Sequence, residues 1–260
     1  MKWDEVKNRI NQKQQKLTIK LKDSEVDEEL IYNIKNSASL LRAQTLFTKE
    51  PVTIRWIRKF IKNRVFFDIG ANVGMYSIYA AKISKVKVYS FEPESNNFNT
   101  LIENIISNNL MSMVNAYPIA ISDTSGFTSL YLSTFDTGSS HHMVDRKLDH
   151  NLKEKAYKHK QGVFKSSLDE IIHNWQFPIP NYLKIDVDGI ENIIVKNSTF
   201  LLKSAELKSI LIEINRNRDE DTEIISILEN VGFKYDKDQV EDSTRKSGIH
   251  KGYAEFLFYK

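Results

Sequence analysis

Short apolar runs alternate with helical patterns along most of the chain, and this alternation predicts the fold. Unbroken apolar runs at residues 65–69, 86–91, 182–187 and 209–214 are typical of strands buried on both faces of a sheet. Helical periodicity follows at 75–83, 95–108 and 219–230, and Gly232 ends the last of these helices. Strands alternating with helices predict an α/β domain whose sheet is mostly parallel.

The remaining pattern completes this domain and adds a segment before it. Strands are expected at 114–119, at 126–132 in a hairpin-like arrangement, and at 233–235 and 253–259, the last antiparallel. Before residue 63, alternation at 17–21 predicts a short strand, and helical spacing at 30–41 and 52–61 predicts two helices. The predicted organisation is a mainly helical extension (1–62) and a ligand-binding domain (63–260), with a lid-like insertion at 133–162.

The turn after the first buried strand carries the strongest functional signal. It reads Asp68-x-Gly70-x-Asn72-x-Gly74 and leads into a helix. Glycines at such a turn allow backbone to approach a ligand closely, and the helix start offers free N–H groups. The turn lacks the third glycine of a dinucleotide fingerprint, and the Asp68 carboxylate opposes a pyrophosphate but suits a cationic amine. The alternative is that the glycines serve packing only.

A second acid follows the next strand at the expected distance. Glu92 lies 24 positions after Asp68, at the end of the run 86–91. An acid placed there can accept hydrogen bonds from ribose hydroxyls. Pro93 cannot continue the ladder and fixes the turn. The alternative is a surface loop acid.

The third strand ends in a cluster of acids. Asp186, Asp188 and Glu191 fall within six positions of one another. Carboxylates this close raise one another's pKa or collect a cation, so the cluster suits a general base or a hard metal such as Mg²⁺. Acids placed at a helix N-terminus for its dipole would explain Glu191 but explain Asp186 poorly.

The insertion contains a rival base. His141 and His142 follow a Gly-Ser-Ser turn, and histidine titrates near neutrality. A long insertion beside a cofactor edge is often a substrate lid, and the alternative is a surface loop.

Composition narrows the function classes. The 260 residues contain no cysteine, which excludes disulfides, thiolate zinc sites and a cysteine nucleophile. No apolar run is long enough to span a membrane and no signal-peptide core is visible, so we expect a cytoplasmic protein. Residues 1–64 hold 15 Lys/Arg against 8 Asp/Glu, a balance of +7. Such a segment could touch an acidic partner, a membrane surface or nucleic acid, or simply present a solvated helical face.

In their order and spacing, these segments resemble the FkbM family of S-adenosylmethionine-dependent methyltransferases. The resemblance covers about residues 65–215. It implies a Rossmann-like class I methyltransferase fold with a seven-stranded, mostly parallel sheet and helices on both faces. One departure is Asp188, where the family usually has Glu. The matching segments are Phe67–Gly74, Phe91-Glu92-Pro93, Asn104 with Asn108, Ala120–Asp123, Ser167–Ile171 and Leu183–Glu191.

The resemblance implies S-adenosylmethionine as the cofactor and a hydroxyl of a sugar, glycan or other small metabolite as the methyl acceptor. Asp186, Asp188, His141 and His142 are the candidates for catalysis, and Asp186, Asp188 and Glu191 are those for a magnesium ion. The expected cofactor contacts are Asp68, Gly70, Asn72, Gly74, Tyr76, Ser77, Glu92, Pro93, Ala120 and Asp186.

Two other functions stay open at this point. An RNA methyltransferase could use the basic N-terminal segment, although no stripe of aromatic residues interleaved with basic ones supports nucleic-acid binding. A cofactor-binding scaffold without catalysis is the other, and the intact acidic cluster argues against it. The N-terminal helices would pack either on the domain or on a second subunit, and in the latter case the protein would be a homo-oligomer.

Overall fold

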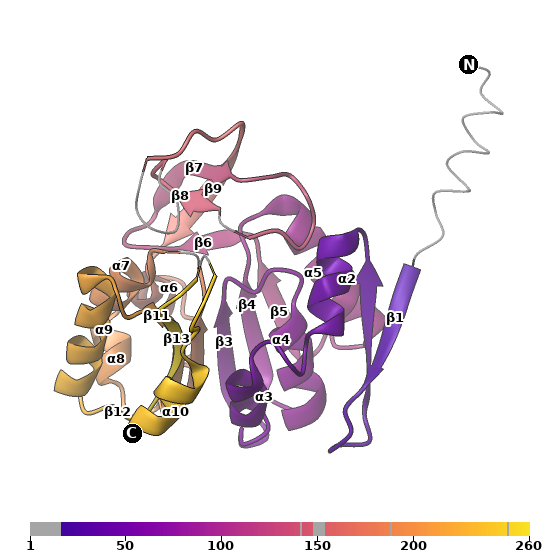
Figure 1. Ribbon diagram of the computed structural model, residues 1–260, viewed down its shortest axis with the longest axis horizontal. Helices are drawn as coiled ribbons and strands as arrows, with labels where there is room; N and C mark the ends of the chain where they lie inside the picture. The colour runs from indigo at the N-terminus through magenta and orange to yellow at the C-terminus, as the bar shows by residue number, and fades with distance from the viewer. Residues whose placement is uncertain (1–16, 141, 148–153, 188, 249) are drawn as a thin grey trace.

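The computed structural model describes residues 17–140, 142–147, 154–187, 189–248 and 250–260, and its centre is a seven-stranded sheet (Figure 1). Its strands are β3 (Val65–Ile69), β4 (Lys87–Phe91), β5 (Val114–Tyr117), β10 (Tyr182–Ile185), β11 (Ser209–Asn215), β12 (Lys234–Tyr235) and β13 (Tyr253–Tyr259). They lie in the order β12-β13-β11-β10-β3-β4-β5. The five strands from β11 to β5 are parallel, and β13 runs antiparallel to both of its neighbours. The expected α/β class is confirmed, and the sheet is mixed.

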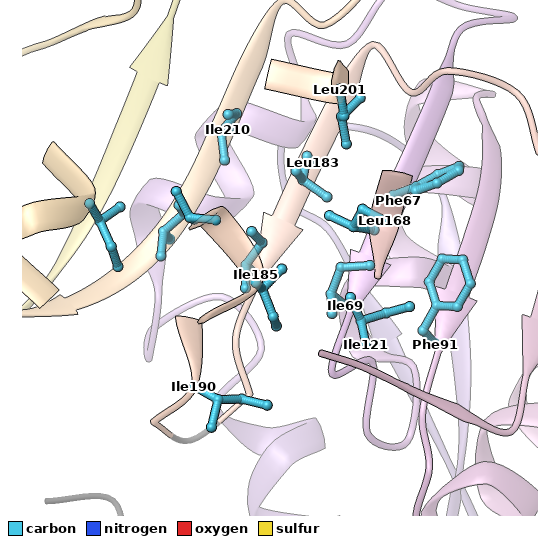
Figure 2. Close-up of a cluster of buried hydrophobic side chains, with 14 of the residues drawn as sticks. Phe67, Ile69, Phe91, Ile121, Leu168, Leu183, Ile185, Ile190, Leu201 and Ile210 are labelled. Carbon is cyan, nitrogen blue, oxygen red and sulfur yellow. The ribbon is translucent and has the colours of Figure 1, made fainter. Parts of the chain in front are cut away.

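Helices cover both faces of this sheet because its strands are apolar on both sides. On β3, Phe67 and Ile69 pack in one buried cluster, which also contains residues of α6–α9 and is shown in part in Figure 2. Phe66 packs on the other face with residues of α3–α5. The expected helix at 75–83 is α4 continued by the π-helix η1. The helices are α3 (Pro51–Ile57), α4 (Met75–Tyr79), η1 (Ala80–Ser84), α5 (Ser95–Ser107), α6 (Leu168–His173), α7 (Glu191–Lys196), α8 (Thr199–Lys203), α9 (Asp219–Asn230) and α10 (Lys237–Ser243).

A second, four-stranded sheet lies above one end of the first (Figure 1). It consists of β6 (Ile119–Ile121), β7 (Gly126–Leu132), β8 (Met143–Val144) and β9 (His159–Ser166), in the order β6-β9-β7-β8. The strand expected at 114–119 is confirmed as β5 but ends at Tyr117, because Pro118 has no N–H for a ladder and separates β5 from β6. The chain thereby leaves the large sheet at its carboxyl edge. The second sheet therefore covers the edge at which ligands of α/β proteins bind.

The N-terminal segment is not mainly helical where the structure describes it. The strand expected at 17–21 is confirmed as β1 (Leu17–Lys22), but the helix expected at 30–41 is wrong. Its first part is the strand β2 (Glu29–Ile34), paired antiparallel with β1, and α2 (Ser37–Gln44) starts only after Asn36 caps it. The backbone N–H groups of Ile31 and Asn33 donate to the Asn108 and Asn104 side chains of α5, at 3.0 and 2.7 Å. This long-range pairing outweighs the helical spacing.

The helix expected at 52–61 is present as α3, and it packs on its own domain. Val52, Ile54 and Ile57 are buried in the cluster that includes Phe66. Trp56 Nε1 donates to Ser209 Oγ of β11 at 2.8 Å. The described part of the N-terminal segment, from residue 17 onward, is therefore packed as part of the domain. None of the helices in the described ranges is long and apolar enough to cross a membrane.

Candidate functional site

A cavity of about 700 Å³ lies at the carboxyl edge of the large sheet, beneath the second sheet. Its size is in the range of ligand sites in proteins. One half is bounded by the glycine turn and the end of β4, and the other by the ends of β10 and β11 and the segment before α3. The first half includes Gly70, Asn72, Glu92, Pro93, Ala120 and Leu130, and the second includes Lys49, Glu50, Asp186, Glu213, Arg245 and His250.

The glycine turn after β3 is pressed against the ends of two other strands. The Gly70 and Ala71 N–H groups both donate to the Phe91 carbonyl of β4, at 2.9 and 3.1 Å. Gly70 has a φ of +79°, and a Cβ added there would lie 2.0 Å from the Asp186 carbonyl oxygen. Only glycine fits this position.

Two other expected cofactor contacts, Gly74 at the end of the turn and Ser77 in α4, serve packing and do not face the cavity. Gly74, with a φ of +84°, precedes α4, and a Cβ there would lie 2.3 Å from Leu101. Ser77 is fully buried in α4, and its Oγ donates to Asp68 Oδ2 at 2.5 Å. Neither Gly74 nor Ser77 lines the cavity. Both stabilise the turn on the side away from the cavity, through packing and a hydrogen bond.

Asp68 is buried beneath the turn. It lines a small hollow of about 40 Å³ next to the cavity, together with Tyr76, Glu50 and Lys184. Burial raises its pKa, although Lys184 and Ser77 act in the opposite direction. Asp68 therefore holds the turn through Ser77 and reaches ligand space only through this hollow.

Glu92 lies on the cavity wall with its carboxylate already oriented. Its Oε2 accepts from the Asn72 N–H at 2.8 Å, and its Oε1 accepts from the Glu94 N–H at 2.9 Å. Burial nevertheless raises the pKa of Glu92 to about 7. The Ser139 carbonyl in the insertion accepts from the side chains of Asn72 and Asn97, at 2.7 and 3.2 Å. The insertion therefore contacts the turn directly beside Glu92.

Asp186 is held by a buried cation. Lys184 Nζ lies 2.6 Å from Asp186 Oδ2 and 3.9 Å from Glu50 Oε2. The same ammonium lies 5.0 Å from the centre of the Tyr76 ring. Burial alone would raise the pKa of Asp186, but the charge of Lys184 outweighs it and holds that pKa below its usual range. Asp186 is therefore an ionised acid with little tendency to take up a proton.

The rest of the expected acidic cluster does not form a metal site in the described residues. Asp188 lies outside them. The carboxylate of Glu191 accepts from the Val187 and Gly189 N–H groups, at 3.1 and 3.0 Å, and burial raises its pKa to about 8. In the ranges that the structure covers, no three His, Cys, Asp or Glu side chains are grouped to hold an ion. Because Lys184 engages Asp186 and backbone N–H groups engage Glu191, these two carboxylates do not offer a Mg²⁺ site.

Of the two histidines, His141 lies outside the described residues and His142 lines the cavity. The Ser133 N–H donates to His142 Nδ1 at 3.3 Å. His142 thus stays a candidate base by position.

Sequence reasoning missed the second half of the cavity except for Asp186. Glu213 lies in β11, and the only signal for it was an acid inside an otherwise apolar strand. Arg42, Lys49 and Arg245 also line this half, and they carry no sequence signal because loops and long-range pairing bring them there. Arg42 Nε donates to the Gly138 carbonyl at 2.6 Å, which joins α2 to the insertion.

The chain is similar to known methyltransferases. The chain matches the methyltransferase FkbM domain over residues 68–235. It is 23% identical to the hexuronic acid methyltransferase AglP of Haloferax volcanii over 188 residues, which cover 72% of this chain and 71% of that protein. The residues given above for the first half of the cavity all fall within the matched region. Of those given for the second half, Asp186 and Glu213 fall within it, whereas Lys49, Glu50, Arg245 and His250 lie outside.

Similar solved structures include a methyltransferase FkbM from Methylobacillus flagellatus, with a TM-score of 0.49 and 14% identity. That match covers 87% of this chain, which spans 56% of the solved one. Aeropyrum pernix fibrillarin with bound S-adenosyl-L-methionine has a TM-score of 0.48 and 10% identity, over 92% of this chain and 81% of its own. Because the family match spans well over half of its residues, the chain belongs to the FkbM family of methyltransferases.

Proposed function

We propose that this methyltransferase transfers the methyl group of S-adenosylmethionine to a hydroxyl of a sugar, with a hexuronic acid as the first candidate acceptor. The observation that carries the proposal is the two-part cavity. Its first half offers a glycine turn and an oriented acid to a nucleoside, and its second half offers charged groups to a polar acceptor. The hexuronic acid comes from the relative in Haloferax volcanii.

In the first half, Glu92 would accept the ribose hydroxyls, as an acid at this strand end does in related folds. Pro93 and Ala120 would contact the base, beside the apolar Phe91 and Leu130. Gly70 and Asn72 would approach the amino-acid end, whose ammonium suits Asp186 and, through the small hollow, Asp68 and Tyr76. The bound sulfonium supplies an already activated methyl group. The protein must orient the acceptor and remove its proton.

In the second half, Arg42, Lys49 and Arg245 could bind an acceptor carboxylate. They come from three separate segments and line the same wall. Lys49 and Arg245 are paired with Glu50 and Glu213, at 2.9 and 2.6 Å. Arg42 has no carboxylate partner among the residues that the structure describes. Its guanidinium group could donate two parallel hydrogen bonds to the carboxylate of an acceptor.

Methyl transfer from a deuterated cofactor tests the proposal. The protein is incubated with S-adenosylmethionine carrying a CD₃ group and with the methyl glycosides of glucuronic acid, galacturonic acid and glucose, or with bulk transfer RNA. We expect the corresponding mass shift on an acidic sugar and a weaker one on the glucoside. Transfer to RNA alone, or cofactor binding without transfer to any acceptor, would contradict the proposal and favour one of the two alternative functions.

Cofactor affinity should depend on pH through Glu92. The carboxylate accepts hydroxyl hydrogen bonds best when ionised, and its pKa is raised to about 7, so affinity should fall as the pH is lowered through this value. We expect Glu92→Gln to weaken binding at least about tenfold, about 1.4 kcal/mol, and to remove the pH dependence. Calorimetry across this range measures both.

Glu241→Gln is the matched control, because Glu241 pairs with Arg216 on an exposed surface away from the cavity. It should bind the cofactor as the original protein does. Equal affinity and an equal pH profile in Glu92→Gln would remove Glu92 from the cofactor site.

A further inference from the structure

Glu213 is an acid in the cavity wall that the sequence analysis did not name as a catalytic candidate. It is near the carboxyl end of β11, the strand next to β10, and its side chain lines the cavity that Asp186 also lines. Arg245 Nη2 donates to its Oε1 at 2.6 Å. The second oxygen, Oε2, accepts no hydrogen bond from any residue in the described ranges, and the side chain remains 23% exposed toward the cavity. One oxygen is thus fixed and the other is accessible.

We infer that Glu213 is the general base that takes the proton from the acceptor hydroxyl, and that Arg245 is the residue that positions it. The inference rests on the proposed function. In the step, the O–H bond breaks and the proton moves to Glu213 Oε2. The freed electron pair of the oxygen forms the new O–CH₃ bond, while the electrons of the S–CH₃ bond return to sulfur, which becomes a neutral thioether.

Asp186 and Glu213 have different surroundings, which separate their roles. The buried Lys184 keeps Asp186 ionised, and its side chain is only 3% exposed. Such a carboxylate stabilises positive charge but binds a proton poorly. Two acids whose surroundings separate their proton affinities are typical of acid–base sites.

The groups that face Glu213 come from four segments. Asp186 lies on β10, Glu255 lies opposite it on β13, and Lys49 with Glu50 precedes α3. Arg245 and His250 come from the segment before β13. Burial first, and then the charge of Asp186, raise the pKa of Glu213 to about 8, while Arg245 and Lys49 act in the opposite direction.

The pH response follows from this balance. A base must be unprotonated, so turnover should rise with pH and level off above the pKa of Glu213. The bound sulfonium adds a positive charge to the cavity, which favours the ionised carboxylate, so the midpoint should lie below the value of about 8 in the free protein. A histidine base would also give a rising profile, so variants must separate the two.

The test compares four variants of the full chain: Glu213→Gln, Arg245→Met, His142→Gln and Glu255→Gln, the last of which removes an acid beside Glu213 that does not line the cavity. Glu255 is directly opposite Glu213 and largely buried, but it does not line the cavity, and its Oε1 accepts from Thr53 at 2.7 Å. Melting temperature, calorimetry with S-adenosylmethionine and CD₃ transfer to the methyl glucuronide and galacturonide are measured for each.

We expect Glu213→Gln to lower turnover at least about a hundredfold with a cofactor affinity within about threefold of the original, and to flatten the pH profile. Arg245→Met should keep partial activity and shift the midpoint of the pH profile upward, since Glu213 loses its cation. His142→Gln should keep the profile of the original protein. Glu255→Gln should keep the turnover and the shape of the profile, with a midpoint shifted slightly downward because Glu213 loses an acidic neighbour. Turnover of Glu213→Gln within threefold of the original, with an unchanged profile, would overturn the inference.

A second measurement needs no acceptor. With glutamate carboxyl carbons labelled with carbon-13, NMR should show two resonances that titrate near pH 8, those of Glu191 and Glu213, and one of the two should be missing from Glu213→Gln. If the resonance that is missing from Glu213→Gln titrates with an ordinary pKa of about 4 to 5, Glu213 is not the base. Failure of every sugar as acceptor would count against the proposed function, while this titration would still decide the protonation of Glu213.

Discussion

Gly70→Ala is expected to remove measurable binding of S-adenosylmethionine, with a dissociation constant raised at least about a hundredfold, about 2.7 kcal/mol. The added methyl group would stand 2.0 Å from the carbonyl oxygen of Asp186, at a φ of +79° that L side chains rarely adopt. Neither backbone segment can move aside without breaking hydrogen bonds. The Gly70 N–H donates to the Phe91 carbonyl, and the Asp186 N–H donates to the Ile69 carbonyl. The turn must therefore leave its position beside Glu92.

Calorimetry and thermal melting decide this result, and Gly126→Ala and Gly162→Ala are the matched controls. A Cβ at Gly126 or Gly162 would meet no atom within 4 Å, so both variants should melt and bind like the original protein. If Gly70→Ala bound the cofactor normally in a folded protein, the turn would not be part of the cofactor site. Loss of folding in Gly70→Ala would still show that the turn tolerates only glycine.

Deletion of residues 1–60 is expected to abolish cooperative folding. It removes large side chains that are at most 7% exposed, each of which contributes about 1.5–3 kcal/mol by burial. Together they contribute about 10–20 kcal/mol, which is as large as or larger than the roughly 5–15 kcal/mol by which a typical domain is stable. These side chains are Leu30, Tyr32, Val52, Ile54, Trp56, Ile57 and Phe60.

The deletion also leaves polar groups in the remaining domain without partners. Asn104 loses Asn33, the Met75 carbonyl loses the Tyr32 hydroxyl, and Glu255 loses Thr53. Deletion of residues 1–22 is the control, because it removes β1, whose residues are exposed or half-buried, but keeps Asp23 and its ion pair with Arg58 at 2.7 Å. Circular dichroism melts compare the two. A cooperative transition near that of the full chain in the longer deletion would show that the segment is dispensable.

The sequence predicted the parts of the fold in which local pattern and tertiary packing agree. The strand before Gly70 and the helix α9 (Asp219–Asn230) have patterns that match their environment, so their positions could be predicted. Residues 30–34 satisfy both a helical and an alternating pattern, and pairing with Asn104 and Asn108 of α5 decides for the strand. Such long-range hydrogen bonds are not visible in a single sequence.

The same limit divides the candidate site. Glu92 follows its strand at a spacing with a known physical reason, so position alone indicated it, and the structure places it on the cavity wall. Glu213 lies in the interior of an apolar run, and its exposure to the cavity depends on which strand lies beside β11. The partner that shapes the behaviour of Asp186 is Lys184, two residues away in the same strand, which reads in sequence as a solvated lysine.

Because Lys184 is buried, the charge of its partner Asp186 should depend little on the ionic strength of the medium. Dissolved ions screen interactions between exposed charges but reach buried pairs poorly. The Lys184–Asp186 pair is shielded on the lysine side, whereas the Lys49 side chain on the same wall is 49% exposed. Added salt should therefore raise the KM for an acidic acceptor and leave the charge of Asp186 almost unchanged. Between fresh water and brine, such an enzyme would differ more in how readily it captures its substrate than in the electrostatic field that Asp186 supplies to the cavity.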